Sequence, residues 1–434
     1  MTLADRLAKG VVLRLYLAAS PLLAPLLRCH LARRLARGKE DPLRWREKLG
    51  HPSLPRPDGP LIWMHAVGVG EALALPGLAR AMLKRRPGMH VLVTSGTRTS
   101  AEALAGNLPE RTFHQFLPLD AAPFVAGFLD HWRPDLAVWA ERDIWPAMVA
   151  GLARRGVAQV LVNGRMDCAS LRAKARAGRL YRDLYRAMAG VGVQDSTTAV
   201  HFAALGVAPL RITVDGSLKA GADPLADLPG LRAEWQARLA GRRVWLAAST
   251  HPGDEVEAAQ AHALLRRTDP AACLIVAPRD PARAAGVLAV LRASGFRAAL
   301  TEGAPECGPE TGLDAYVVPK IGQMGLWYRL ADTALVGGSL ATVGGHNPYE
   351  PARLDCAILH GPHVGNFAGD YAAFHAASAA RLVTTAAELA AALADPALAL
   401  QCAAAAGVAD QGRAGLDLVA QRLLSVLAVR CGSA

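Results

Sequence analysis

The sequence lacks the motifs of several common protein classes. Its seven cysteines are scattered and include no Cys-x-x-Cys pair, which argues against a disulfide framework or a zinc ribbon and favours a reducing compartment. No Gly-x-x-x-x-Gly-Lys-[Ser/Thr] or His-Glu-x-x-His stretch occurs, so neither an NTPase P-loop nor a zinc protease is expected. The thirteen histidines have no spacing typical of metal ligands, and His65 and His251 are expected to be ordinary hydrogen-bonded residues. We expect no metal site and no cofactor.

The sequence also lacks an uninterrupted apolar run of the ~20 residues that a transmembrane helix usually needs. Residues 11–27 come nearest, but Arg14, Pro21 and Pro25 interrupt them, and basic residues follow at once. By the positive-inside rule the body of the protein would stay cytoplasmic. We expect residues 1–50 to form an uncleaved membrane anchor or a helix lying in the interface. An ordinary helix packed on its own domain is the alternative.

Positive charge is in excess and is concentrated near the N-terminus. The formal net charge is +11, and residues 1–60 hold 12 Lys/Arg against 5 Asp/Glu, a net of +7. These basic residues show no aromatic interleaving and no recognised nucleic-acid module, so no nucleic-acid partner is expected. The anionic surface of a membrane is the expected partner.

Short apolar runs alternate with helical patterns over most of the chain, which is typical of parallel sheets flanked by helices. A break at 221–242 separates two such series, which predicts two doubly wound Rossmann-like α/β domains, residues 51–225 and 226–434, facing a central cleft. The expected strands are 61–67, 90–95, 113–119, 136–141, 158–164, 190–194 and 211–216, then 244–250, 273–278, 296–300, 315–319, 333–338, 356–361 and 381–385.

The loops after the strands carry the informative residues, because open parallel sheets bind ligands beyond the carboxyl ends of their strands. The first such loop, Gly68-Val-Gly-Glu71, is not a dinucleotide fingerprint, since Leu73 stands where glycine or alanine is needed. Glu71 begins a helix, where the dipole favours an ionised carboxylate. From this turn alone Glu71 is either a general base or a helix charge without chemistry.

The loop at 337–352 is long, glycine-rich and followed by a helix. Such a turn can bring backbone N–H groups and a helix N-terminus up to a phosphate, and Glu350 at its end could bind the paired hydroxyls of a ribose.

Taken together and in order, these motifs resemble the 3-deoxy-D-manno-octulosonic acid (Kdo) transferases. The matching blocks are WMHAVGVGE, LPLD, ERDIWP, NGRM, DGSLK, ASTHPGDE, APRD, ADTALVGGSL, GGHNPYEPA and GPHVGNF. The resemblance implies a GT-B, inverting, metal-independent glycosyltransferase that moves Kdo from CMP-Kdo to the lipid A precursor in lipopolysaccharide biosynthesis. It also implies a location on the cytoplasmic face of the inner membrane.

The resemblance further assigns roles to residues. Glu71 would be the general base, and Glu141 and Lys219 would stabilise the transition state. The donor would be bound by Pro278, Arg279, Ile321, Gly322, Gln323, Asn347, Pro348, Tyr349 and Glu350.

Four positions depart from the pattern of the family. Gly68 replaces a usual serine, Asp280 a histidine, Gln323 a glutamate and Tyr349 a leucine. Asp280 would repel an anionic donor unless Arg279 or Arg283 is paired with it. Two other functions stay open: a membrane-associated GT-B transferase with a different nucleotide sugar, and a catalytically silent GT-B scaffold.

Overall fold

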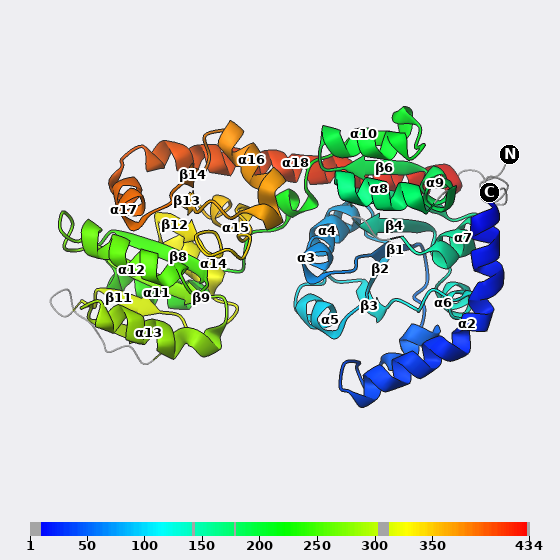
Figure 1. The fold of residues 1–434 in the computed structure, drawn as a ribbon, viewed down its shortest axis with the longest axis horizontal. Coiled ribbons are helices and arrows are strands. Elements are labelled where there is room, and N and C mark those ends of the chain that lie inside the picture. Colours follow the sequence, from blue (N-terminus) through cyan, green and yellow to red (C-terminus); the bar gives the residue numbers. More distant parts are fainter. Residues whose placement is uncertain (1–9, 141–143, 178, 303–311, 432–434) are drawn as a thin grey trace. The chain divides into compact units, whose positions relative to one another are not determined.

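The computed structural model describes residues 10–140, 144–177, 179–302 and 312–431, and the chain forms two compact units. The first unit consists of Met1–Ala222 and Gly412–Ala434, and the second of Asp223–Gln411. Each unit is built around one parallel sheet with helices on both faces (Figure 1). This confirms the expected pair of Rossmann-like α/β domains.

Each sheet has seven strands, and every expected strand is present. The first has the order β3-β2-β1-β4-β5-β6-β7 and the second β10-β11-β9-β8-β12-β13-β14. The strand order reverses between β1 and β4 and between β8 and β12, and such switch points are where ligands bind. The bounds are β1 Leu61–His65, β2 His90–Ser95, β3 Thr112–Phe116, β4 Leu136–Ala140, β5 Ala158–Gly164, β6 Gly190–Val193, β7 Ile212–Val214, β8 Val244–Thr250, β9 Cys273–Pro278, β10 Ala298–Leu300, β11 Ala315–Val317, β12 Thr333–Val336, β13 Ala357–His360 and β14 Arg381–Leu382.

The helices that cover these sheets keep the labels of Figure 1. Those of the first unit are α2 Val11–Ala36, α3 Val69–Ala72, α4 Leu75–Arg85, α5 Arg98–Ala105, α6 Ala122–Trp132, α7 Pro146–Arg154, α8 Cys168–Arg176, α9 Arg179–Arg186 and α10 Ser196–Ala204. The second unit has α11 Pro229–Arg238, α12 Asp254–Leu265, α13 Ala284–Ala293, α14 Met324–Leu330, α15 Tyr349–Ala352, α16 Ala368–Ala376 and α17 Ala386–Ala394, and α18 (Leu398–Cys431) begins there.

The strands are continuous apolar runs because both of their faces are covered. In β1, Leu61 and Trp63 belong to the core formed with α6 and α7, whereas Ile62 and Met64 belong to the core formed with α4 and the end of α18. All five side chains of β1 are buried. Burying a side chain of this size stabilises the fold by about 1.5 to 3 kcal/mol.

Helix α2 is long and apolar enough to cross a membrane, yet one of its faces packs on the first unit. Leu13 and Leu31 are buried on that face. Tyr16 donates a hydrogen bond to Asp120 (Oη to Oδ2, 2.7 Å), and Ser20 Oγ accepts one from the backbone N–H of Ala122 (3.0 Å). The N-terminal segment therefore forms a helix with one docked face.

Helix α18 belongs to both units. It begins in the second, but from Gly412 onward it packs on the first sheet, where Leu416 and Leu423 complete the core beneath β1. Arg422 forms an ion pair with Asp215 near the end of β7. The division of the chain thus differs from the expected continuous domain 226–434, because the last apolar residues cover the first sheet.

Candidate active site

The turn after β1 carries Glu71, at the switch point of the first sheet. A Cβ added to Gly68 would collide with Oε2 of Glu71, so the carboxylate folds back over the residue that precedes its own helix. Within the described part of the chain, no hydrogen bond or ion pair engages this carboxylate. A partly buried carboxylate that is not committed to a protein partner can accept a proton from a substrate.

The helix at Glu71 is shorter than the sequence indicates. The turn forms the four-residue helix α3, and α4 begins separately at Leu75 with Pro76 in its first turn. Proline has no backbone N–H, so it starts a helix more readily than it continues one. The dipole acting on Glu71 is therefore that of a single helical turn.

Lys219 lies beside the same turn. A Cβ added to Gly70 would be 3.8 Å from the Lys219 ammonium nitrogen, so the lysine and the backbone next to Glu71 are neighbours. Lys219 sits in a short 3-10 helix, Leu218–Gly221. The side chain of Asn163, at the end of β5, accepts a hydrogen bond from the Leu218 N–H (2.9 Å) and holds that helix. The Lys219 ammonium therefore lies next to the turn that carries Glu71.

His65 is a hydrogen-bonded strand residue, as expected. Its Nδ1 lies 3.1 Å from the Thr94 carbonyl oxygen, and Trp145 Nε1 donates to its Nε2 at 3.4 Å. Burial lowers the pKa of His65 to about 4, so the ring is neutral near neutral pH. It links the end of β1 to the segment before α7.

The predicted residue Glu141 lies outside the described residues. Among those that are described, no group of three or more His, Cys, Asp or Glu side chains could hold a metal ion.

In the second unit, Asp254 organises the loop that follows β12. Its buried carboxylate accepts four backbone N–H groups. Oδ2 accepts from His251 (2.9 Å) and Gly338 (2.7 Å), and Oδ1 from Leu340 (3.1 Å) and Ala341 (3.0 Å). Asp254 was not predicted as an important residue from the sequence. It could have been, because it directly follows Gly253 and lies in the first turn of a helix that follows a strand.

This network limits the amides that the glycine-rich turn could offer to a phosphate. The N–H groups of Gly338, Leu340 and Ala341 are taken by Asp254, and those of Gly344 and Gly345 donate to the Gly338 carbonyl oxygen. These five N–H groups are therefore not available to a ligand.

Four of the predicted donor residues are related by charge and hydrogen bonding. Asn347 donates to Glu350 (Nδ2 to Oε1, 3.4 Å), and its Oδ1 accepts from the Tyr349 N–H (3.1 Å). Burial raises the pKa of Glu350, while Asn347 and the positive charges of Arg279 and Arg353 act in the opposite direction. Arg279 follows β9, so the neighbouring loops meet at the carboxyl edge of the second sheet.

Two histidines lie at the same edge: His251, which is hydrogen-bonded as expected, and His346, which the sequence did not single out. The Nε2 atoms of His251 and His346 are 3.0 Å apart, and the two rings are nearly parallel. Burial, followed by the charge of Arg279, lowers the pKa of His346 to about 4. One ring must donate and the other accept in this hydrogen bond.

The remaining predicted donor residues differ in exposure. Pro278 is the last residue of β9 and is buried, as is Pro348. Tyr349 is 4% exposed and packs edge-on against Phe374, so its ring is part of the core. The segment Ile321–Gln323 follows β11, the neighbour of β9, and leads into α14; Ile321 is 81% exposed.

Asp280 is exposed, and its carboxylate accepts the Ala282 N–H (3.0 Å). Arg283 is paired instead with Glu255 (Nη1 to Oε1, 2.7 Å). Of the two arginines that could neutralise Asp280, Arg283 is thus engaged by Glu255.

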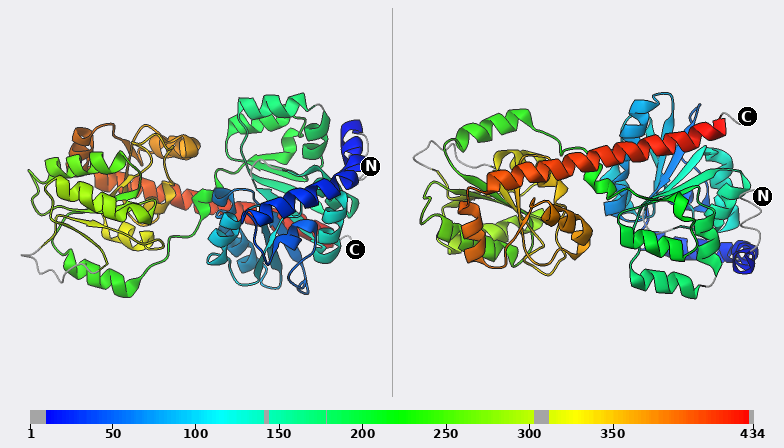
Figure 2. Two further views of the ribbon diagram at one scale, coloured as in Figure 1. Left: turned by 60° about the horizontal axis from the view of Figure 1, so that its bottom comes forward. Right: turned by 90° about the horizontal axis from the view of Figure 1, so that it is seen from above.

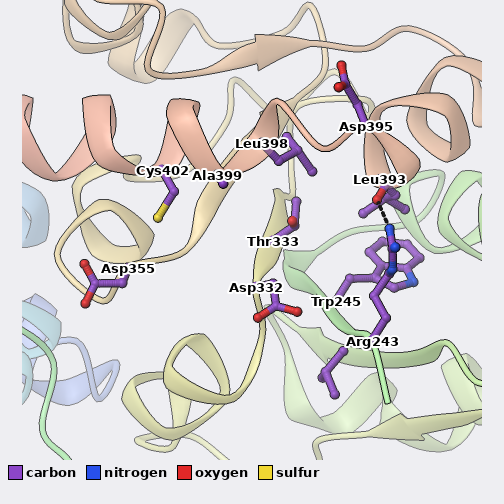
Figure 3. A pocket seen from close by; sticks show the side chains of 11 residues that line it. Arg243, Trp245, Asp332, Thr333, Asp355, Leu393, Asp395, Leu398, Ala399 and Cys402 are labelled. Atoms are coloured by element: carbon purple, nitrogen blue, oxygen red, sulfur yellow. Dashed lines mark hydrogen bonds between the residues drawn. The ribbon is translucent and has the colours of Figure 1, made fainter. Parts of the chain in front are cut away.

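A cavity of about 470 Å³ lies at the other end of the second sheet (Figure 3). It opens beside the first residues of β8 and β12, and its lining includes Arg243, Asp332, Asp355 and Cys402. Arg243 is engaged by the Leu393 carbonyl oxygen (2.7 Å). Because ligands of such sheets bind at the carboxyl ends of the strands, this cavity is not part of the site described above.

Comparisons with known sequences agree on one family. The model of a family described as 3-deoxy-D-manno-octulosonic-acid transferase (kdotransferase) matches residues 43–222. A probable mitochondrial 3-deoxy-D-manno-octulosonic acid transferase of Arabidopsis thaliana is 31% identical over 364 residues, covering 82% of this chain and 81% of the relative. The 3-deoxy-D-manno-octulosonic acid transferase of Bordetella pertussis is 35% identical over 327 residues, covering 72% of this chain and 74% of the relative.

Solved structures show the same fold. A glycosyltransferase from Rickettsia africae has a TM-score of 0.56 at 11% identity, covering 87% of this chain and all of its own (100%). A UDP-GlcNAc 2-epimerase from Neisseria meningitidis has a TM-score of 0.54 at 10% identity, covering 84% and 99%. Identities this low bear on the fold alone.

Proposed function

Because the chain belongs to the 3-deoxy-D-manno-octulosonic acid (Kdo) transferase family, we propose that it transfers Kdo from CMP-Kdo to the lipid A precursor, with Glu71 as the base. Membership makes the chain a glycosyltransferase of GT-B architecture. The nature of the acceptor, the roles of single residues and the absence of a metal requirement are proposals.

The observation that carries the proposed mechanism is the uncommitted carboxylate of Glu71 at the switch point of the first sheet. In the reaction a hydroxyl oxygen of the acceptor glucosamine attacks C2 of Kdo. The new C–O bond forms as the bond from C2 to the CMP phosphate breaks, and the configuration at C2 is inverted. Glu71 takes the hydroxyl proton as this bond forms.

Lys219 supports the proposal from the other side of the same turn, since its ammonium lies near Gly70. A cation placed there would stabilise negative charge that develops as CMP departs. Glu141 is proposed for the same task on the basis of the family motif alone. CMP would be bound in the second unit by Arg279, Asn347 and Glu350, whose loops meet at the edge of its sheet.

We place the protein at the cytoplasmic face of the inner membrane. Helix α2 has the length and hydropathy of a membrane helix, and the basic residues after it favour the side that carries anionic lipids.

Replacing Glu71 with glutamine tests the mechanism. The amide cannot accept the proton, so the rate of transfer should fall by about two to four orders of magnitude. The affinity for CMP should stay within about two-fold, because the base acts on the acceptor. Product mass on a tetra-acylated disaccharide, with CMP-Kdo generated in situ and no divalent metal added at the transfer step, gives the readout, and calorimetry gives CMP affinity.

Glu102→Gln is the matched control, since it removes an equivalent charge from an exposed helix of the same unit. Loss of CMP binding in Glu71→Gln would remove Glu71 from the role of base. If the unchanged protein adds no Kdo where another Kdo transferase does, a different nucleotide sugar or a silent scaffold becomes the better reading.

A further inference from the structure

Helix α2 is fixed to the first unit along its length. At its N-terminus a Cβ on Gly10 would collide with the carboxylate of Asp183, in α9. Further along, Tyr16 donates to Asp120, and Ser20 accepts from the N–H of the first residue of α6. Figure 2 shows α2, in blue, running along the surface of this unit. Crossing a bilayer would require α2 to leave this surface and break these hydrogen bonds, which is costly for buried polar groups.

Asp120 makes that separation costlier still. Besides the Tyr16 hydroxyl, its carboxylate accepts the N–H groups of Ala147 (2.9 Å) and Met148 (3.0 Å), and so caps α7, which has no side-chain cap of its own. Helix α2 and the first turn of α7 are therefore both hydrogen-bonded to the Asp120 carboxylate.

The face of α2 opposite the one that packs on the first unit is apolar and exposed. Leu15, Leu22 and Leu26 are 65%, 78% and 67% exposed. Exposed leucines gathered on one helix face mark a surface that contacts something apolar. A bilayer can cover this face while the docked face stays on the protein.

Next to α2 lies a basic surface built by α8 and α9. Residues 165–186 hold seven Lys/Arg against two Asp. Helix α9 packs against α2, and α8 buries none of its side chains. The arginines concerned are all exposed, and none is in an ion pair with another described residue: Arg172, Arg176, Arg179 and Arg182.

We propose that α2 lies in the plane of the membrane interface without crossing it, and that the exposed arginines of α8 and α9 bind the headgroups of acidic phospholipids. The inference deepens the proposed membrane location and rests on it. It adds the attachment geometry and the lipid chemistry: apolar contact along α2 and phosphate contact along α8 and α9. Arginine pairs well with phosphate oxygens, and each basic residue near an anionic leaflet strengthens binding about five-fold.

Vesicle sedimentation of the full chain tests the lipid chemistry. With vesicles of phosphatidylcholine and phosphatidylglycerol, replacing Arg172 and Arg176 with alanine should weaken binding by about 25-fold. With pure phosphatidylcholine the same variant should bind like the unchanged protein. Alanine keeps α8 helical, and Lys84→Ala with Arg86→Ala removes the same charge from exposed positions at the C-terminal end of α4 as the control. Equal losses in both double variants, or none in the first, would overturn the headgroup assignment.

Nitroxide labels at positions 15, 22 and 26, in a background without accessible cysteines, test the geometry. All three should report a similar, shallow depth in the vesicles, because they lie on one face of a helix parallel to the surface. A label at 22 near the bilayer centre, with 15 and 26 progressively nearer opposite surfaces, would mean that α2 spans. Both measurements need no substrate, so an absence of Kdo transfer by the unchanged protein would reject the proposed function without touching this result.

Discussion

Replacing Asp254 with asparagine tests whether one buried carboxylate stabilises the glycine-rich turn of the second unit. In the structure each of its oxygens accepts two backbone N–H groups, from His251 and Gly338 on one side and from Leu340 and Ala341 on the other. Asparagine has one acceptor oxygen, so its NH₂ group must face two of these donors. Whichever way the amide turns, two backbone N–H groups lose their partner.

The size of the effect follows from this count. A buried donor left without a partner costs about 1 to 3 kcal/mol, so the substitution should lower the free energy of unfolding of the second unit by about 2 to 6 kcal/mol. The turn leads into Asn347 and Glu350, which are proposed to bind CMP. The affinity for CMP should therefore fall by about ten-fold or more, which corresponds to a loss of only about 1.4 kcal/mol.

Urea unfolding of the full chain, followed by circular dichroism, measures the free energy of unfolding. Calorimetry measures the affinity for CMP. Asp280→Asn is the matched control for the unfolding measurement, because Asp280 is exposed in the same unit and, among the described residues, its carboxylate accepts a hydrogen bond from the Ala282 N–H alone. The reasoning is refuted if Asp254→Asn unfolds within about 0.5 kcal/mol of the unchanged protein, the range of ordinary surface substitutions.

Two further predictions concern stability. Gly337→Ala should lower the free energy of unfolding by about 1 to 3 kcal/mol, because the new Cβ would lie 2.6 Å from the Ser249 carbonyl oxygen. Gly286→Ala lies at an open position in a helix and should raise the free energy of unfolding by about 0.5 to 1 kcal/mol. Thermal melts of the two variants separate the effect of steric crowding from that of helix propensity. Burial lowers the pKa of both His65 and His262 to about 4, so these rings resist protonation in the folded state. The free energy of unfolding should therefore be highest above about pH 6.5 and should fall as the pH falls towards 4, by up to about 3 kcal/mol per histidine. Urea midpoints that stay constant between about pH 7 and pH 5 would contradict this.

The strands were predictable from the sequence because the physics that forms them is local. A strand buried on both faces must be apolar at every position, and β1, with five buried residues between turns, is typical. The alternation of strands and helices then places Glu71 and the loop at 337–350 directly after strands, at the carboxyl ends of the two sheets. These expectations needed no knowledge of which residues meet across the fold.

Features that depend on distant partners could not be predicted. Asp254 and Gly338 are 84 residues apart, and nothing in either neighbourhood indicates their hydrogen bond. The alanine-rich C-terminal helix can be expected from its composition, but not that Leu416 packs against Gly77 and Gly221, which lie about 200 residues or more before it in the chain but in the same unit. The break between α3 and α4 depends on Pro76, whose effect on the helix length at Glu71 was not anticipated.

The course of α18 has a consequence for the order of events on the ribosome. Ile62 and Met64 are made early, whereas Leu416 and Leu423, which lie in the same core, are made only after residues 223–411. The second unit is thus synthesised before this core of the first sheet can be completed. A nascent chain halted after residue 222 would expose part of this core to water, and the core closes only once residues 416–427 have emerged from the ribosome.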